Sequence, residues 1–123
     1  MRCHRFILIL LALVMVGCDE PDRKDAARLT GGNPDKGKAA IRHNGCASCH
    51  EIPGITEARG LVGPPLNRMG ARTYIGGVVT NTPANMVQWL QDPPAIDDKT
   101  AMPNVHLSAN DSRDIAAYLY TLR

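Results

Sequence analysis

The stretch Asn44–Ile52 reads NGCASCHEI and places two cysteines three residues apart, with a histidine directly after the second. Three chemistries require Cys46, Cys49 and His50 to be held this close together. They are half of a zinc site, a thiol redox pair, and covalent attachment of a haem through the two sulfurs. Each makes a different demand on the rest of the 123-residue chain, so the surrounding sequence decides between them.

The remainder of the chain favours haem attachment. A structural zinc site needs four ligands, usually Cys or His, and downstream of residue 18 the sequence has no second CxxC and no pair of histidines at zinc-finger spacing. A thioredoxin-like pair belongs to a βαβ pattern, which is not visible, whereas C-x-x-C-H is the signature of c-type haem attachment. The motif therefore predicts one haem c, bound covalently through Cys46 and Cys49, with His50 as an iron ligand.

The composition is poor in large side chains for a hydrophobic core. Aromatic residues make up 4% of the chain, whereas Gly (11) and Pro (9) are abundant. A domain of about 100 residues buries a smaller fraction of its surface than a larger one. A large buried apolar group such as haem would make up this shortfall, and a zinc ion would not.

Three segments carry the start and stop signals of helices. The first begins after the N-cap candidate Asn33 and ends before Gly45, a natural C′ residue. The second lies between Thr82 and Pro93, and the third follows Ser108 with an apolar stripe at i, i+3, i+4 and i+7. No pair of alternating strands is visible, so the sequence predicts a mostly α fold.

One glycine lies inside the first predicted helix. Gly37 costs that helix about 1 kcal/mol relative to Ala, and close contact with another helix is a physical reason to keep it. We expect the C-terminal helix to pack there, with Tyr118 near Gly37. Farther along, Gly76 and Gly77 are expected to break a short helical or extended turn.

If the haem serves electron transfer, its iron takes a sixth ligand. The candidates in the sequence are Met69, Met86, Met102, His43 and His106. Met102 lies in a loop rich in proline and turn residues, which can bring its side chain over the haem face opposite His50. The two other methionines lie where a buried Met is the commoner outcome, and His43 is too close in sequence to His50. Met102 is therefore the predicted ligand, with His106 as its rival.

The N-terminus predicts export and lipidation. Arg2 and Arg5 precede an unbroken apolar run over 6–16. That run is too short for a membrane span, which needs roughly 20 residues, but it fits the h-region of a signal peptide. A small residue then precedes Cys18, as in the lipobox of bacterial lipoproteins, so we expect a signal peptide over 1–17 and lipidation of Cys18.

Three regions are predicted from this reading: the signal peptide, a lipid anchor with a flexible tether over 18–32, and one haem domain over 33–123. Losing Arg2 and Arg5 with the signal peptide lowers Lys plus Arg from 14 to 12, equal to the 12 Asp plus Glu. No basic tract remains to suggest nucleic acid. We expect an exported protein, lipid-anchored on the periplasmic side of a bacterial membrane.

From about Asn33 to Arg123 the sequence resembles the class I c-type cytochromes. GCASCH, VGPPLNRMGARTY, NMVQWLQDP, TAMPN and DIAAYLYTL occur in that family's order and spacing. The likeness is greatest to the cytochrome-c domains fused to subunit II of some bacterial haem-copper oxidases and to small bacterial electron carriers. The resemblance implies the cytochrome c fold, with three to five helices wrapped around one covalently bound haem.

The resemblance also implies roles around the haem. The Pro64 carbonyl would accept a hydrogen bond from Nδ1–H of His50 and so leave Nε2 for the iron. Arg72 and Thr100 match neighbours of a haem propionate, where donor groups satisfy a partly buried carboxylate. The remaining implied haem neighbours are Leu66, Tyr74 and Trp89, the last beside the methionine ligand.

By this resemblance the protein is a single-electron carrier rather than an enzyme. Its partners would be a quinol-oxidising complex as donor and a terminal oxidase or reductase as acceptor. The chain lacks the lysine-rich face of eukaryotic members, so strongly electrostatic docking is not expected. Two alternatives stay open: a haem subunit of an oxidoreductase complex, and a ligand-binding haem sensor in which Met102 is displaced.

Overall fold

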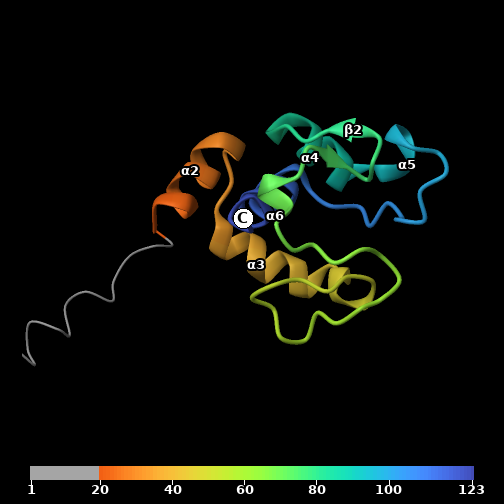
Figure 1. Cartoon of the computed structure of the whole chain (residues 1–123), viewed down its shortest axis with the longest axis horizontal. Coiled ribbons are helices and arrows are strands. Elements are labelled where there is room, and N and C mark those ends of the chain that lie inside the picture. Colours follow the sequence, from red (N-terminus) through yellow and green to blue (C-terminus); the bar gives the residue numbers. More distant parts are fainter. Residues whose placement is uncertain (1–19) are drawn as a thin grey trace, which may run out of the picture.

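The computed structural model describes residues 20–123, and the predicted signal peptide and Cys18 lie outside this range (Figure 1). Its elements are α2 (Glu20–Thr30), α3 (Pro34–His43), η1 (Cys46–Ser48), η2 (Met69–Ala71), β1 (Tyr74–Ile75), β2 (Val79–Thr80), α4 (Pro83–Gln91), α5 (Pro93–Ile96) and α6 (Ala109–Tyr120). The mostly α class is confirmed. Within residues 20–123, no helix has the length and apolar character needed to cross a membrane.

The helices begin where their capping residues predict. The side chains of Asn33, Thr82 and Ser108 each accept a hydrogen bond from backbone N–H groups in the first turn of α3, α4 and α6. Gly45 follows the C-cap of α3 with a φ of 77°, a conformation that glycine adopts without steric cost. These predictions are confirmed. The N-cap side chains pair with backbone N–H groups that the start of a helix would otherwise leave unpaired.

Two local features differ from the sequence predictions. A small antiparallel sheet is present after all, with β1 and β2 joined through Gly76 and Gly77, both at positive φ. Two residues per strand are too few to show an alternating pattern in the sequence. Pro93 ends α4 as predicted but also begins the short helix α5, because its fixed φ suits the first helical position.

The prediction of a flexible tether over 18–32 is wrong for the part that the structure describes. Residues 20–30 form α2, which packs against α6. Ala26 is fully buried, and Thr30, also buried, donates its hydroxyl to the Ala26 carbonyl oxygen at 2.8 Å. The packing face therefore consists of small residues. This face contains no Leu or Ile, and most residues of the segment are charged. The sequence therefore shows no hydrophobic periodicity that would predict a packed helix.

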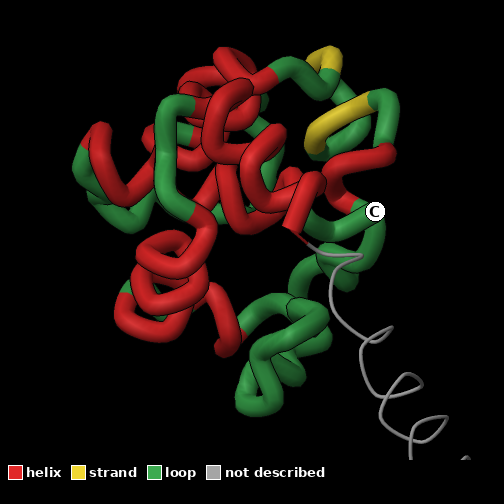
Figure 2. Tube along the Cα trace, turned by 90° about the vertical axis from the view of Figure 1, so that its left-hand side faces the viewer, coloured by secondary structure: helices red, strands yellow, loops and turns green. Residues whose placement is uncertain are grey.

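Contacts at both ends show that α2 runs antiparallel to α6. Asp22 near the start of α2 pairs with Arg123 beyond the end of α6 at 3.8 Å. Gly32, just after α2, lies so close to Arg113 near the start of α6 that a Cβ would overlap its carbonyl group. α2 thus lies against α6 as an additional helix. Figure 2 shows most of the helical segments in the upper and left parts of the view, with a large group of loop segments at the bottom.

α3 and α6 approach each other closely at Gly37. A Cβ on this glycine would overlap the Asp114 carbonyl oxygen and lie 2.5 Å from its carbonyl carbon. The helix at this contact was predicted correctly, but its partner residue lies one turn earlier than Tyr118. Tyr118 instead packs over Gly54, and its hydroxyl donates to the Pro53 carbonyl oxygen at 2.6 Å.

Removing that hydroxyl is expected to destabilise the fold in a pH-dependent way. Burial raises the pKa of Tyr118 above its usual value near 10. A raised folded-state pKa stabilises the protein below pH about 10, and this contribution is lost as pH rises further. Tyr118→Phe should cost about 1 kcal/mol at neutral pH. Denaturant unfolding from neutral pH to pH about 11 should show the difference from wild type narrowing, and a constant difference would contradict this.

Candidate cofactor cleft

A cleft of about 390 Å³ lies between segments that are far apart in the sequence. Residues of the segments 44–50 and 100–107 line it, and α4 and α6 also supply side chains. Figure 1 shows the chain after η1 in the lower part of the molecule and the segment after α5 at the upper right. The cleft is lined mainly by apolar side chains, as is usual for cofactor sites.

Both motif cysteines line the cleft because η1 is a 3₁₀ turn. In this geometry the side chains at i and i+3 eclipse one another. The Cys46 carbonyl oxygen accepts hydrogen bonds from the backbone N–H of Cys49 at 3.2 Å and of His50 at 3.0 Å. One turn therefore directs two sulfurs and an imidazole to the same cleft.

The environment of Cys46 favours the neutral form of its thiol. Burial raises the pKa of the Cys46 thiol, and the neighbouring Cys49 raises it further, against a hydrogen bond with the Cys46 backbone that lowers it. A partly buried, uncharged thiol fits an apolar cleft better than a thiolate, because desolvating a charge is costly.

His50 is oriented by the loop that carries Pro64. Its Nδ1 lies 2.7 Å from the Pro64 carbonyl oxygen. A carbonyl can only accept, so Nδ1 carries the proton and Nε2 keeps its lone pair. Gly63 lies against the ring, since a Cβ there would be 2.8 Å from Nδ1. The backbone N–H of Gly63 also donates to the Cys49 carbonyl oxygen at 2.7 Å. The loop and the CxxCH turn are thus one hydrogen-bonded unit.

Met102 reaches the same cleft from the loop between α5 and α6. Its backbone N–H donates to the Thr100 hydroxyl oxygen at 3.2 Å, and both residues line the cleft. The rival His106 is exposed at a φ of 58° and does not line the cleft. His43 is also exposed, on α3. The structure therefore brings Met102, and neither rival histidine, to the cleft.

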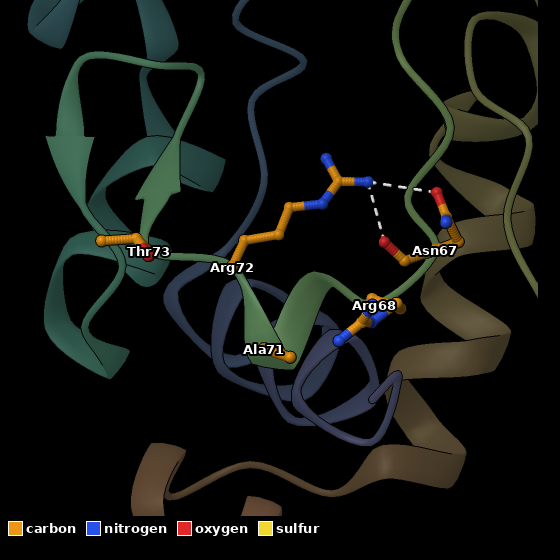
Figure 3. A pocket seen from close by; sticks show the side chains of 5 residues that line it. All are labelled: Asn67, Arg68, Ala71, Arg72 and Thr73. Carbon is orange, nitrogen blue, oxygen red and sulfur yellow. Dashed lines mark hydrogen bonds between the residues drawn. The ribbon is translucent and has the colours of Figure 1, made fainter.

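Arg72 lies between the cleft and a shallow pocket on the neighbouring surface, which Figure 3 shows from close by. Its Nη2 donates to the carbonyl oxygens of Pro65 at 2.5 Å and Asn67 at 2.8 Å, and contacts the Asn67 side-chain oxygen at 3.2 Å. Nη2 carries two of the five guanidinium N–H donors. Arg72 thus holds the loop that contains Pro64 through Nη2. The three N–H donors on Nε and Nη1 take no part in these contacts with the loop.

Of the remaining predicted haem neighbours, Leu66 and Trp89 line the cleft and Tyr74 does not. Leu66 is half-buried and Trp89 is buried. Tyr74 is 56% exposed. The reason is the alternation of side chains along a strand: Ile75, the next residue of β1, is buried and faces the cleft.

Sequence reasoning missed several lining residues. Among them are Ile75, Leu90, Ile115 and Leu119, together with Gly63 and Gly76, while Met69 and Met86 were named only as candidate iron ligands. Ile115 and Leu119 belong to the apolar stripe of the C-terminal helix, and the two methionines are buried as expected. A sequence pattern cannot separate residues of the core from residues that line the cleft, because both are apolar side chains on one face of a helix or strand. For the two glycines, the sequence does not show whether the residue is needed for a turn or for close packing.

The donor set fits a covalently bound haem. Two thiols in one turn, an imidazole with a free Nε2 and three methionine thioethers border a single apolar cleft. Within residues 20–123, no three His, Cys, Asp or Glu side chains come together as a metal-binding group. A mostly α chain with this cleft has the form of a c-type haem protein.

Comparisons with known proteins agree with this class. The family model of cytochrome c matches residues 34–123, so the chain belongs to the cytochrome c family. The chain is also similar to the protein named cytochrome c oxidase subunit 2 from Alkalihalophilus pseudofirmus, at 29% identity over 90 residues. That match covers 72% of this chain but only 25% of the relative. The family implies electron transfer and a covalent haem c, for which Cys46 and Cys49 form the expected CxxC pair.

Proposed function

We propose that the protein is a membrane-tethered single-electron carrier on the periplasmic side of a bacterial membrane. One haem c would be attached through Cys46 and Cys49, with His50 and Met102 as its iron ligands. The observation that carries this proposal is the convergence of these four side chains on one apolar cleft, with His50 held by the Pro64 carbonyl. Lipidation of Cys18 after removal of 1–17 would supply the tether.

When bound, the haem iron supplies a centre that gains and loses one electron. Residues of the chain around the cleft support this chemistry. The hydrogen bond from His50 to Pro64 keeps one tautomer, and Arg72 holds the loop that carries Pro64. Arg72 and Thr100, both at the cleft, offer donors for the haem carboxylates. Met102 would be the second protein ligand of the iron and so exclude a small ligand.

The partners would be a quinol-oxidising complex as electron donor and a terminal oxidase or reductase as acceptor. A tether raises the effective concentration of the carrier at membrane partners. A second candidate, a fixed subunit of such a complex, is favoured by the similarity to a protein named as an oxidase subunit. Purification in mild detergent separates the two, because a fixed subunit co-purifies with its complex at constant stoichiometry.

The direct test is the intact mass and the absorption spectrum of protein made with a working haem-attachment system. We expect the mass of the mature polypeptide plus one haem and the lipid on Cys18, and loss of the haem mass alone in Cys46→Ala/Cys49→Ala. Cys18→Ala should keep the haem but leave the membrane fraction, which tests the anchor separately. A colourless exported protein would contradict the haem assignment, and a soluble wild-type protein would contradict the tether.

A further inference from the structure

The side chain of Asn81 joins three parts of the fold, although it does not line the cleft. Asn81 lies between β2 and α4 and is half-buried. Its Nδ2 donates to the carbonyl oxygens of Met69 at 2.8 Å and of Arg72 at 2.9 Å. Its Oδ1 accepts a hydrogen bond from the hydroxyl of Tyr120 on α6 at 2.8 Å. Both amide hydrogens and the amide oxygen therefore have partners.

The three partners of Asn81 match the donors and acceptor of an amide. The two carbonyl oxygens can only accept, so the group that faces them must supply two N–H donors, which fixes the orientation of the amide. An aspartate of the same shape would place a negatively charged oxygen against both carbonyls. An aliphatic side chain would leave the two carbonyl oxygens and the tyrosine hydroxyl without this partner, and an unpaired buried polar group is destabilising.

Arg72 carries this constraint to the loop that contains Pro64. The backbone carbonyl of Arg72 is held by Asn81. At the other end of the residue, Nη2 donates to the carbonyl oxygens of Pro65 and Asn67, and Figure 3 shows the side chain reaching Asn67. Pro64 directly precedes the first of these carbonyls. The guanidinium therefore fixes the loop next to the carbonyl that pairs with the histidine of the CxxCH motif.

We propose that Asn81 is a positioning residue for His50, an inference that rests on the proposed role of His50 as an iron ligand. Asn81 acts through Arg72. Because the Arg72 carbonyl is fixed, the guanidinium stays on the loop carbonyls, and the loop keeps the Pro64 carbonyl oxygen on Nδ1 of His50. Tyr120 fixes the Asn81 amide, so the path begins on α6. The hydrogen-bond partner of a histidine ligand sets its tautomer and ring orientation.

The competing explanation is a role in packing alone. Asn81 also holds the Met69 carbonyl, and the N–H of Gly70 in η2 donates to the Leu122 carbonyl oxygen beyond the end of α6 at 2.9 Å. A role confined to this contact between η2 and α6 predicts that loss of Asn81 lowers the overall stability without a selective change at His50. The path through the arginine predicts that the loop opens while the rest of the protein stays folded.

Hydrogen exchange in the reduced, haem-loaded protein, followed by NMR, distinguishes these roles. The probes are Nδ1–H of His50 and the backbone N–H groups of Gly63 and Leu66, which donate to carbonyl oxygens of Cys49 and Glu51. Replacing the asparagine by leucine should speed exchange of all three roughly tenfold, equivalent to about 1.4 kcal/mol. The effect should appear without denaturant, where local opening rather than global unfolding limits exchange.

Asn85→Leu is the matched control for Asn81→Leu. Asn85 lies on α4, and its Nδ2 also donates to a backbone carbonyl, that of Thr80 at 2.9 Å, which is not part of the path. The control should leave the three exchange rates as in wild type. Arg72→Met keeps the aliphatic stem but removes the donors, so it should reproduce the effect of Asn81→Leu. The double variant should show no further increase, because both changes break the same path.

Two results would overturn the inference: exchange at His50 as slow in Asn81→Leu as in the control, or additive effects of Asn81→Leu and Arg72→Met. If Asn81→Leu takes up no haem, Tyr120→Phe replaces it, since this change removes only the hydroxyl that fixes the amide. Tyr120→Phe should speed exchange at His50 roughly threefold, and a wild-type rate would then overturn the inference. A wild-type protein that takes up no haem would instead contradict the proposed function.

Discussion

A Gly37→Ala variant is expected to unfold at a clearly lower denaturant concentration than the wild-type protein. Helix propensity alone predicts the opposite, a gain of about 1 kcal/mol. The added methyl group, however, would overlap the backbone carbonyl of Asp114 on α6. Backbone atoms cannot rotate aside, so α3 and α6 must separate, which costs about 1–3 kcal/mol or more. The sign of the change in the free energy of unfolding therefore shows whether helix propensity or the contact with α6 dominates at this position.

The matched control for this variant is Ala39→Gly. Ala39 is exposed on the same helix, so the substitution changes one methyl group without touching α6. It should cost about 1 kcal/mol through helix propensity alone. If Gly37→Ala proved as stable as wild type, the close approach of α3 and α6 would be disproved. Because α6 also supplies Ile115 and Leu119 to the cleft, the same variant should weaken haem retention on heating.

A Met102→Ala variant is expected to keep its covalent haem but lose the methionine-ligated, low-spin spectrum. Attachment depends on the cysteines in η1, whereas Met102 approaches from the loop between α5 and α6. His/Met ligation raises the reduction potential of haem, and axial ligands as a class move it over about 0.8 V. We expect the midpoint potential to fall by on the order of 0.1 V, and the reduced protein to bind carbon monoxide readily.

His106→Asn is the control for the ligand assignment. His106 holds a positive φ, which asparagine tolerates better than most residues, so the substitution removes the imidazole without straining the loop. The spectrum and potential should match wild type. Loss of the low-spin spectrum in this variant, or its persistence in Met102→Ala, would transfer the ligand role away from Met102. Unchanged behaviour of both variants would point to one of the buried methionines.

The success of the helix predictions has a local cause. Asn33, Thr82 and Ser108 act through bonds to the next few residues, so their effect can be read without knowing the rest of the fold. The failure at α2 has the opposite cause. Its stabilising contact is the burial of Ala26 against other helices, and a small residue carries no sequence signal that distinguishes burial from exposure.

The residues of the site likewise include some that a local pattern predicts and others that only the tertiary structure shows. Cys46, Cys49 and His50 are joined by one 3₁₀ turn, and the spacing of the motif alone predicts that they act together. Tyr74 and Ile75 differ by one position, and only the strand pairing shows which of them faces the cleft. For Arg72, the sequence cannot show that its Nη2 donates to the loop that carries Pro64.

The sequence by itself determined the kind of chemistry, because the CxxCH spacing and the helix caps act over a few neighbouring residues. Only the tertiary structure decided that Met102 and not His106 reaches the cleft, that α2 packs on α6, and that Gly37 meets Asp114. These features depend on contacts between residues distant in the chain, which no local pattern encodes.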